Sequence, residues 1–209
     1  MKKTYLIVGL VLVIAFAGFY QFLEKKPVTP PESALIFPEA RVLAPFSLTD
    51  NHDKTFTERN LHGVWSFFFF GYTHCPDICP ATLRLMQQAW EILDKQQQAD
   101  NLQFIFVSVD PARDTPAVMD KYITYFNPKF VGLTGSEEQI TKLGEQFGVF
   151  YVKTPGSEAQ QTENNYLIEH TGSVMFIDPQ GRYFANLSPP FTAEVLANDI
   201  LIAQQHYQP

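Results

Sequence analysis

Two short apolar runs that flank a helical pattern constrain the fold of this chain more than any other feature. Residues 64–70 lie between two glycines and form a run too short for a helix, which predicts a buried strand. From residue 80 to about 97, apolar residues recur every three or four positions, which predicts a helix. A second buried run at 102–109 follows. This order indicates a parallel strand pair joined by a right-handed crossover.

The pattern after residue 109 continues the alternation. Thr115 followed by Pro116 predicts the start of a helix that reaches about residue 126. A short strand at 130–133 precedes a capping box, Ser136 with Gln139, and a helix to about 147. We expect a strand at 149–153, a mobile polar loop at 154–165, a hairpin of strands 173–177 and 183–187, and a last helix from 192 to about 205. The order is that of a thioredoxin-like α/β domain.

The N-terminal part divides into three segments. Residues 5–23 are almost entirely apolar and span about 28 Å as a helix, close to the thickness of a bilayer core. We interpret residues 1–26 as a membrane anchor, although the sequence at 15–17 also has the form of a signal-peptide cleavage site. Residues 27–38 are a proline-rich tether and 39–209 the thioredoxin-like domain. A turn at 50–54 predicts an N-terminal β-hairpin laid on the main sheet.

Composition excludes several classes of protein. The net charge is −7 and no basic cluster is present, so we expect no nucleic-acid partner. Nineteen phenylalanines supply a substantial core. The two cysteines are too few for a disulfide framework. An anchored chain of this kind places its domain on the periplasmic side of a bacterial inner membrane, an oxidising compartment.

The two cysteines, Cys75 and Cys79, stand in a loop that leads from the first strand into the first helix. The start of a helix stabilises thiolate, which is both a nucleophile and a metal ligand. Residues four apart lie on one face of a helix, a spacing that suits either a disulfide or a metal ion. A proline after Cys79 suggests that the regular helix begins only at or after Pro80, so this geometry is approximate.

A third ligand must come from elsewhere in the chain. Of the five histidines, His170 stands out because residues just before the penultimate strand of a thioredoxin-like domain lie near the helix that carries the cysteines. A purely structural histidine is the rival interpretation. His74, although adjacent to Cys75, is expected to be a polar rim residue. Two thiolates and an imidazole favour copper over magnesium or calcium, with zinc a weaker alternative.

Three motifs, GYTHCPDICPATL, SVDPARDTP and EHTGSVMFIDPQG, closely resemble those of the Sco/SenC family in order and spacing. The resemblance covers about residues 40–205. It implies a membrane-anchored copper protein, binding Cu(I) or Cu(II), that assists assembly of the dinuclear copper centre of cytochrome c oxidase. Its copper ligands would be Cys75, Cys79 and His170. Asp77, Asp110 and Asp114 match positions that the family keeps near the site.

Two functions remain open. The first is a copper chaperone, not an enzyme, whose partners are the copper-bearing subunit of the oxidase and a periplasmic thiol reductant. The second is a thiol–disulfide oxidoreductase or redox sensor in which Cys75 and Cys79 form a redox-active disulfide. The pair lacks the usual C-x-x-C spacing, which favours the first function. In either case the protein would sit in the inner membrane by a single helix, with its domain facing the periplasm.

Overall fold

The structure of the chain is a computed structural model that describes residues 30–155, 166–170 and 172–208. The predicted anchor and residues 27–29 of the predicted tether lie outside these residues, whereas residues 34–38 of the predicted tether belong to a strand of the domain. Within the described part of the chain, no helix has the length and apolar character needed to cross a membrane.

The described strands form one eight-stranded mixed sheet and one separate two-stranded sheet. The large sheet has the order β1-β10-β9-β4-β5-β6-β2-β3, in which β4, β5 and β6 are parallel and the other pairs antiparallel. Its strands are β1 (Ala34–Val42), β2 (Ser47–Asp50), β3 (Thr55–Thr57), β4 (Trp65–Gly71), β5 (Leu102–Ser108), β6 (Val131–Thr134), β9 (Val174–Ile177) and β10 (Arg182–Leu187). The predicted parallel pair is confirmed as β4 and β5.

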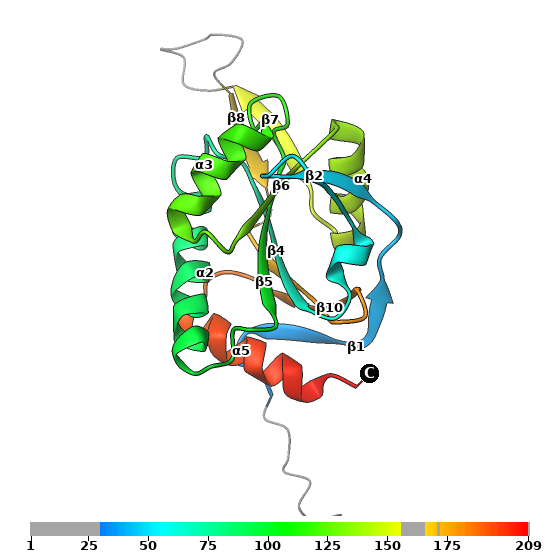
Figure 1. Cartoon of the computed structure of the whole chain (residues 1–209), viewed down its shortest axis with the longest axis vertical. Coiled ribbons are helices and arrows are strands. Elements are labelled where there is room, and N and C mark those ends of the chain that lie inside the picture. The colour runs from blue at the N-terminus through cyan, green and yellow to red at the C-terminus, as the bar shows by residue number, and fades with distance from the viewer. Residues whose placement is uncertain (1–29, 156–165, 171, 209) are drawn as a thin grey trace, which may run out of the picture. The chain divides into compact units, whose positions relative to one another are not determined.

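Helices cover both faces of the large sheet (Figure 1). They are α2 (Ile78–Lys95), α3 (Pro116–Phe126), α4 (Glu137–Phe147) and α5 (Ala193–His206), with a 3-10 turn η1 (Glu58–Leu61). The helices α2, α3 and α5 lie on one face and α4 lies on the other. Alternating phenylalanines of β4 reach both layers. Phe69 contacts Phe106, which in turn contacts Tyr122 of α3, while Phe68 contacts Phe147 of α4.

Strand β4 is the centre of the core because every one of its residues is buried. Its four consecutive phenylalanines are fully buried, and burial of each stabilises the fold by about 1.5–3 kcal/mol. Such continuous burial is typical of a central strand covered by helices on both faces. The strand therefore forms a rigid base for the loop that follows it, which carries the cysteines.

The predicted helix starts are confirmed with one exception. The side chains of Thr115, Ser136 and Thr192 cap α3, α4 and α5 by accepting hydrogen bonds from backbone N–H groups. The predicted capping box is only half formed, because the side chain of Gln139 accepts instead from the backbone N–H of Ser47 at 3.3 Å. The expectation that α2 begins at or after Pro80 is wrong, because α2 begins at Ile78. A proline at the third helical position removes only an N–H group that has no acceptor within the helix, so it is tolerated in the first turn.

The N-terminal strands occupy opposite edges of the sheet. The predicted hairpin is confirmed as β2 and β3, but it extends the edge next to β6 instead of lying on the sheet. Strand β1 pairs with β10 at the other edge. The buried carboxylate of Asp199 in α5 holds the start of β1, accepting hydrogen bonds from the backbone N–H groups of Glu32, Ser33 and Ala34 at 2.7–3.0 Å.

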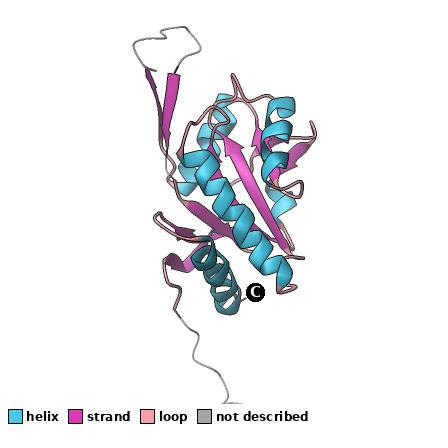
Figure 2. Cartoon of the chain, turned by 90° about the vertical axis from the view of Figure 1, so that its left-hand side faces the viewer, coloured by secondary structure: helices cyan, strands magenta, loops and turns pink. Residues whose placement is uncertain are grey.

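A separate hairpin consists of β7 (Tyr151–Pro155) and β8 (Tyr166–His170). It stands at the end of the domain opposite to β1 (Figures 1 and 2). The sequence predicted a strand at 149–153 but not β8. The predicted mobile loop at 154–165 differs from the structure at residues 154 and 155, which belong to β7, and its remainder lies outside the described residues.

Candidate metal centre

The two cysteines lie where β4 passes into α2. Cys75 is partly exposed in the loop, and Cys79 is fully buried in the first turn of α2. The backbone N–H of Cys79 lies 3.5 Å from Cys75 Sγ, within hydrogen-bonding distance of a sulfur acceptor. The first turn of the helix therefore directs at Cys75 an N–H group that has no acceptor within the helix, together with the positive end of the helix dipole.

Gly71, the last residue of β4, makes room for this arrangement. A Cβ atom at this position would lie 2.7 Å from Cys79 Sγ and 2.7 Å from Cε2 of the Phe106 ring. Real Cβ atoms do not approach other atoms so closely, so the side chain of Cys79 packs directly against a glycine backbone.

His170 ends β8 and faces the cysteines. Its Nε2 lies 3.2 Å from Cys79 Sγ. The imidazole also packs against the rings of Phe69 and Tyr72, with ring centroids 6.0 and 6.1 Å away. One potential ligand atom from each of Cys75, Cys79 and His170 lies within 4.8 Å of the others. The structure thus brings together the three residues that the sequence singled out.

This group matches the size that a metal ion requires. In a trigonal planar site, metal bonds of roughly 2.0–2.3 Å to nitrogen and sulfur place the three ligand atoms about 3.5–4 Å from one another. The observed separations, up to 4.8 Å, need only small side-chain adjustments to reach that geometry. Two sulfurs with one imidazole form a soft donor set, which selects Cu(I) over hard cations.

The two thiols have opposite acidities. The thiol of Cys79 donates a hydrogen bond to Cys75, and this bond is the main reason why the pKa of Cys75 falls to about 3. The hydrogen bond with His170 and the backbone N–H groups of Asp77 and Cys79 lower the pKa of Cys75 further. The same thiol–thiolate hydrogen bond, together with burial, raises the pKa of Cys79. The pair therefore holds one proton and presents its thiolate at the more exposed sulfur.

Asp114 stabilises the cysteine loop. Its carboxylate is fully buried and accepts hydrogen bonds from the backbone N–H of Thr73 at 3.0 Å and the Thr73 hydroxyl at 2.5 Å. The hydroxyl of Ser108, at the end of β5, donates to the same carboxylate at 2.6 Å. Asp114 therefore links the loop after β4 to the end of β5, and it acts on the position of the loop that leads to Cys75.

Asp110 stabilises the position of β8, the strand that carries His170. It is fully buried, forms an ion pair with Arg113, and accepts a hydrogen bond from the Tyr166 hydroxyl at 2.5 Å. The Arg113 guanidinium lies over the Tyr166 ring at 3.7 Å and donates to the Tyr166 carbonyl at 3.3 Å. The backbone N–H of Ile168 donates to the Tyr72 hydroxyl at 3.1 Å. These contacts connect the loop after β5 and the cysteine loop to β8.

The remaining candidates lie at the rim. The side chain of Asp77 is exposed and forms no capping hydrogen bond with α2, so its backbone N–H is its contribution to the centre. His74 is exposed and its Nδ1 lies 3.0 Å from the Thr73 hydroxyl, which agrees with the expected rim position. The other three histidines lie in the β2–β3 turn, after η1 and at the end of α5.

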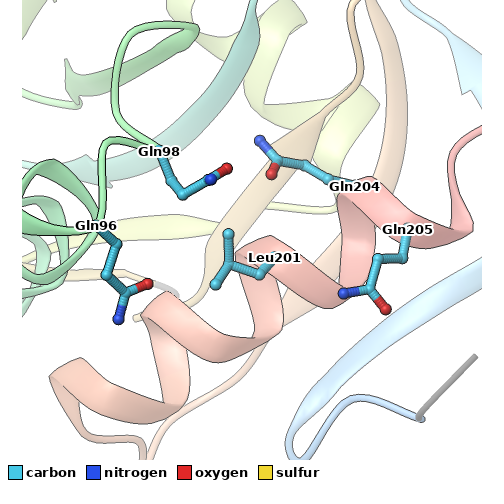
Figure 3. Close-up of a pocket in the computed structure, with 5 residues that line it drawn as sticks. All are labelled: Gln96, Gln98, Leu201, Gln204 and Gln205. Carbon is cyan, nitrogen blue, oxygen red and sulfur yellow. The ribbon is translucent and has the colours of Figure 1, made fainter.

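Surface depressions lie along α2, and two of them are at its ends. One, of about 410 Å³, adjoins the cysteine loop and is lined by Pro76, Asp77, Pro80, Ala81, Arg84, Leu85 and Gln88. The other, also of about 410 Å³, lies between the end of α2 and α5 (Figure 3). Its described lining is four glutamines and Leu201, which supply no thiol, imidazole or carboxylate. Of these two depressions, the first adjoins the cysteines.

Sequence reasoning missed four residues that shape the centre: Gly71, Tyr72, Arg113 and Tyr166. Tyr72 and Arg113 stand inside the quoted motifs. Tyr72 is close in sequence to the cysteines and Arg113 to Asp110, and this closeness indicates a role at the centre. Tyr166 begins a short apolar stretch after a polar one, which was a weak signal for a strand. Nothing local indicates that Gly71 must accommodate a sulfur.

Comparisons with known proteins agree with the geometry. The family model described as SCO1/SenC matches residues 37–203. The chain is 33% identical to a SCO2-like protein of Rickettsia conorii, over 93% of this chain and 96% of that protein. It is similar to the structure of Arabidopsis thaliana ScoI with copper bound, at 32% identity and a TM-score of 0.71, over 78% of this chain and 98% of that one. The structure of yeast Sco1 with copper bound matches at 30% identity and a TM-score of 0.72, over 81% and 91%.

Proposed function

The chain belongs to the SCO1/SenC family, and from that premise we propose that it binds one copper ion and delivers it during assembly of cytochrome c oxidase. The observation that carries the proposal is the group of Cys75, Cys79 and His170, whose ligand atoms lie within 4.8 Å of one another. Two solved relatives with the same fold hold copper, as their descriptions state. The recipient would be the copper-bearing subunit of the oxidase.

The division of labour among the ligands follows from their surroundings. Cys75 is partly exposed and already a thiolate, so it is the sulfur that first meets an incoming ion. Cys79 loses its proton when the ion binds, since a coordinating thiol is deprotonated. His170 supplies a neutral imidazole nitrogen from a different element of the fold. Release to a recipient would begin at Cys75, beside the depression that adjoins the cysteine loop.

Membrane attachment is part of the proposal. The apolar residues 5–23 would anchor the protein in the inner membrane by one helix, with the folded domain, which begins with β1 at Ala34, in the periplasm. A periplasmic thiol reductant would keep Cys75 and Cys79 reduced, since an oxidising compartment favours their disulfide. These assignments rest on the composition of residues 1–38.

Titration of the reduced full chain with Cu(I), in competition with a chelator, tests the copper proposal. We expect about one equivalent to bind to the wild type, and His170→Ala to weaken binding by about tenfold or more because it removes a ligand. His52→Ala is the matched control, since His52 is exposed in the β2–β3 turn. Wild-type affinity in His170→Ala, or no uptake by the wild type, contradicts the proposal. Copper-loaded chain mixed with the recipient domain then tests delivery.

A second function is favoured by the acidity of Cys75. A thiolate with a neighbouring thiol can attack a substrate disulfide, after which Cys79 displaces the reduced substrate and leaves a Cys75–Cys79 disulfide. The external reductant would then regenerate the dithiol. Reduction of a small disulfide in the absence of copper distinguishes this activity, which requires both cysteines but not His170.

A further inference from the structure

His170 and the cysteines belong to different parts of the fold. Cys79 is part of α2 and packs against the end of the central strand β4. His170 belongs to the β7–β8 hairpin, a sheet that is separate from the large one among the described residues. No strand ladder therefore fixes the imidazole relative to the sulfurs, and its position depends on side-chain contacts.

The contacts that hold β8 involve alternate residues. Tyr166, Ile168 and His170 are two apart and so point to one face of the strand. The first is held by Asp110 and Arg113, and the second by the Tyr72 hydroxyl. Fixing two residues of this face determines where the third points. We call Tyr166, Arg113, Asp110 and Tyr72 the β8 latch.

The latch has the properties of a strong attachment. Asp110 is fully buried and the side chain of Arg113 is only 12% exposed, so their ion pair is largely shielded from solvent. The planar guanidinium stacks on the Tyr166 ring, and one of its N–H groups donates a hydrogen bond to the backbone carbonyl of Tyr166. A lysine could not make both contacts. The Tyr166 hydroxyl completes the attachment with a short bond to Asp110.

A single turn supports both the cysteine loop and the strand that carries His170. The backbone N–H groups of Arg113 and Asp114 both donate to the carbonyl of Asp110, at 3.1 and 2.9 Å. Arg113 is directed to Tyr166 on β8, while the Asp114 carboxylate binds Thr73 in the cysteine loop. The turn at 110–114 is thus a common base on which the histidine strand and the cysteine loop are aligned.

We propose that Arg113 and Tyr166 are positioning residues that set copper affinity by holding His170 against Cys79. The inference rests on the proposed function, and it adds the part of the chain that pre-organises the third ligand. When the latch is open, the centre lacks His170. The apparent affinity then falls in proportion to the fraction of molecules in which the latch is closed.

The test compares two single-hydroxyl deletions in the reduced full chain. Tyr166→Phe removes the bond to Asp110 and is expected to weaken Cu(I) binding by about tenfold, the lower end of the range for residues that orient metal ligands. Tyr151→Phe is the matched control on β7, where Tyr151 pairs with His170. Its hydroxyl meets Thr141 of α4 in an exposed bond that water can replace, so less than a twofold change is expected. Arg113→Lys keeps the charge but loses the stacking, so it should resemble Tyr166→Phe.

A double-mutant cycle with His170→Ala shows whether the latch acts through the imidazole. In that background Tyr166→Phe should change Cu(I) affinity by less than about twofold, because the ligand that it positions is gone. A tenfold loss that persists without His170 overturns the proposal. So does a loss in Tyr151→Phe equal to that in Tyr166→Phe, or an unchanged affinity in Tyr166→Phe.

A metal-free measurement separates failure of the latch from failure of the proposed function. The imidazole of His170 lies beside the rings of Phe69 and Tyr72, so its NMR signals carry ring-current shifts. We expect these shifts to move in Tyr166→Phe and to stay in place in Tyr151→Phe. If the wild type takes up no copper, the proposed function fails while this comparison still tests the latch, and unchanged shifts in Tyr166→Phe overturn it.

Discussion

Replacing Gly71 by alanine tests how closely the metal centre is packed against the core. The added Cβ would lie 2.7 Å from both Cys79 Sγ and the Phe106 ring, whereas ordinary contact begins at 3.4 Å. The sulfur, the ring or the strand must therefore move by about 0.7 Å. Overpacking of a core costs about 1–3 kcal/mol, and the lower entropy of the unfolded alanine chain offsets about 0.4–1 kcal/mol. We expect a net destabilisation of about 1–2 kcal/mol.

The same displacement should impair metal binding. A site functions when its ligands are held within about 0.5 Å, so we expect copper affinity to fall by about tenfold or more. Denaturant unfolding of the reduced metal-free chain measures the first effect and Cu(I) competition the second. Gly132→Ala on β6 is the control, because the nearest atom, at 3.1 Å, is the flexible end of Met119. Wild-type stability together with wild-type affinity in Gly71→Ala would refute the reasoning.

Two further predictions follow from buried or perturbed groups. Because the pKa of Cys75 is lowered to about 3, its side chain stays a thiolate as the pH falls toward that value. Alkylation of Cys75 by iodoacetamide should therefore keep a nearly constant rate between about pH 5 and 8. An alkylation rate that rises through this range, with a midpoint near 8 or 9, contradicts the assignment. Asp199→Ala removes the acceptor of three backbone N–H groups at the start of β1, of which that of Ala34 is buried, and should destabilise the domain by about 2–4 kcal/mol in urea unfolding. A change below about 0.5 kcal/mol would show that water replaces the carboxylate.

Local patterns predicted most of the helices and central strands. The periodicity of α2 and the continuous burial of β4 follow from a chain that must cover both faces of a sheet. The N-caps Thr115 and Ser136 could be predicted because a hydroxyl at the N-cap position accepts a hydrogen bond from a backbone N–H of the first helical turn. The start of α2 was misjudged, since a first-turn proline has no helical hydrogen bond to lose.

The missed features depend on contacts between distant parts of the chain. Which edge of the sheet accepts β1 is decided by β10 and by Asp199, which is 165 residues from Ala34 in the chain. Among the described residues, strand β8 spans five positions and forms no ladder with the large sheet, so its attachment to Arg113 has no local signature. The three candidate ligands were recognised from residue type and fold order, whereas their spacing depends on packing at Gly71 and around Tyr72.

The hairpin that carries His170 and the strand at which the described chain begins lie at opposite ends of the domain (Figures 1 and 2). In a protein fastened through residues 1–26, as proposed, the chain that leads to the anchor would therefore leave the domain at the end away from this hairpin. A recipient that projects its own binding loops from the same membrane could then be met above the lipid surface. Length of the tether, more than strength of the anchor, would decide which recipients are within range.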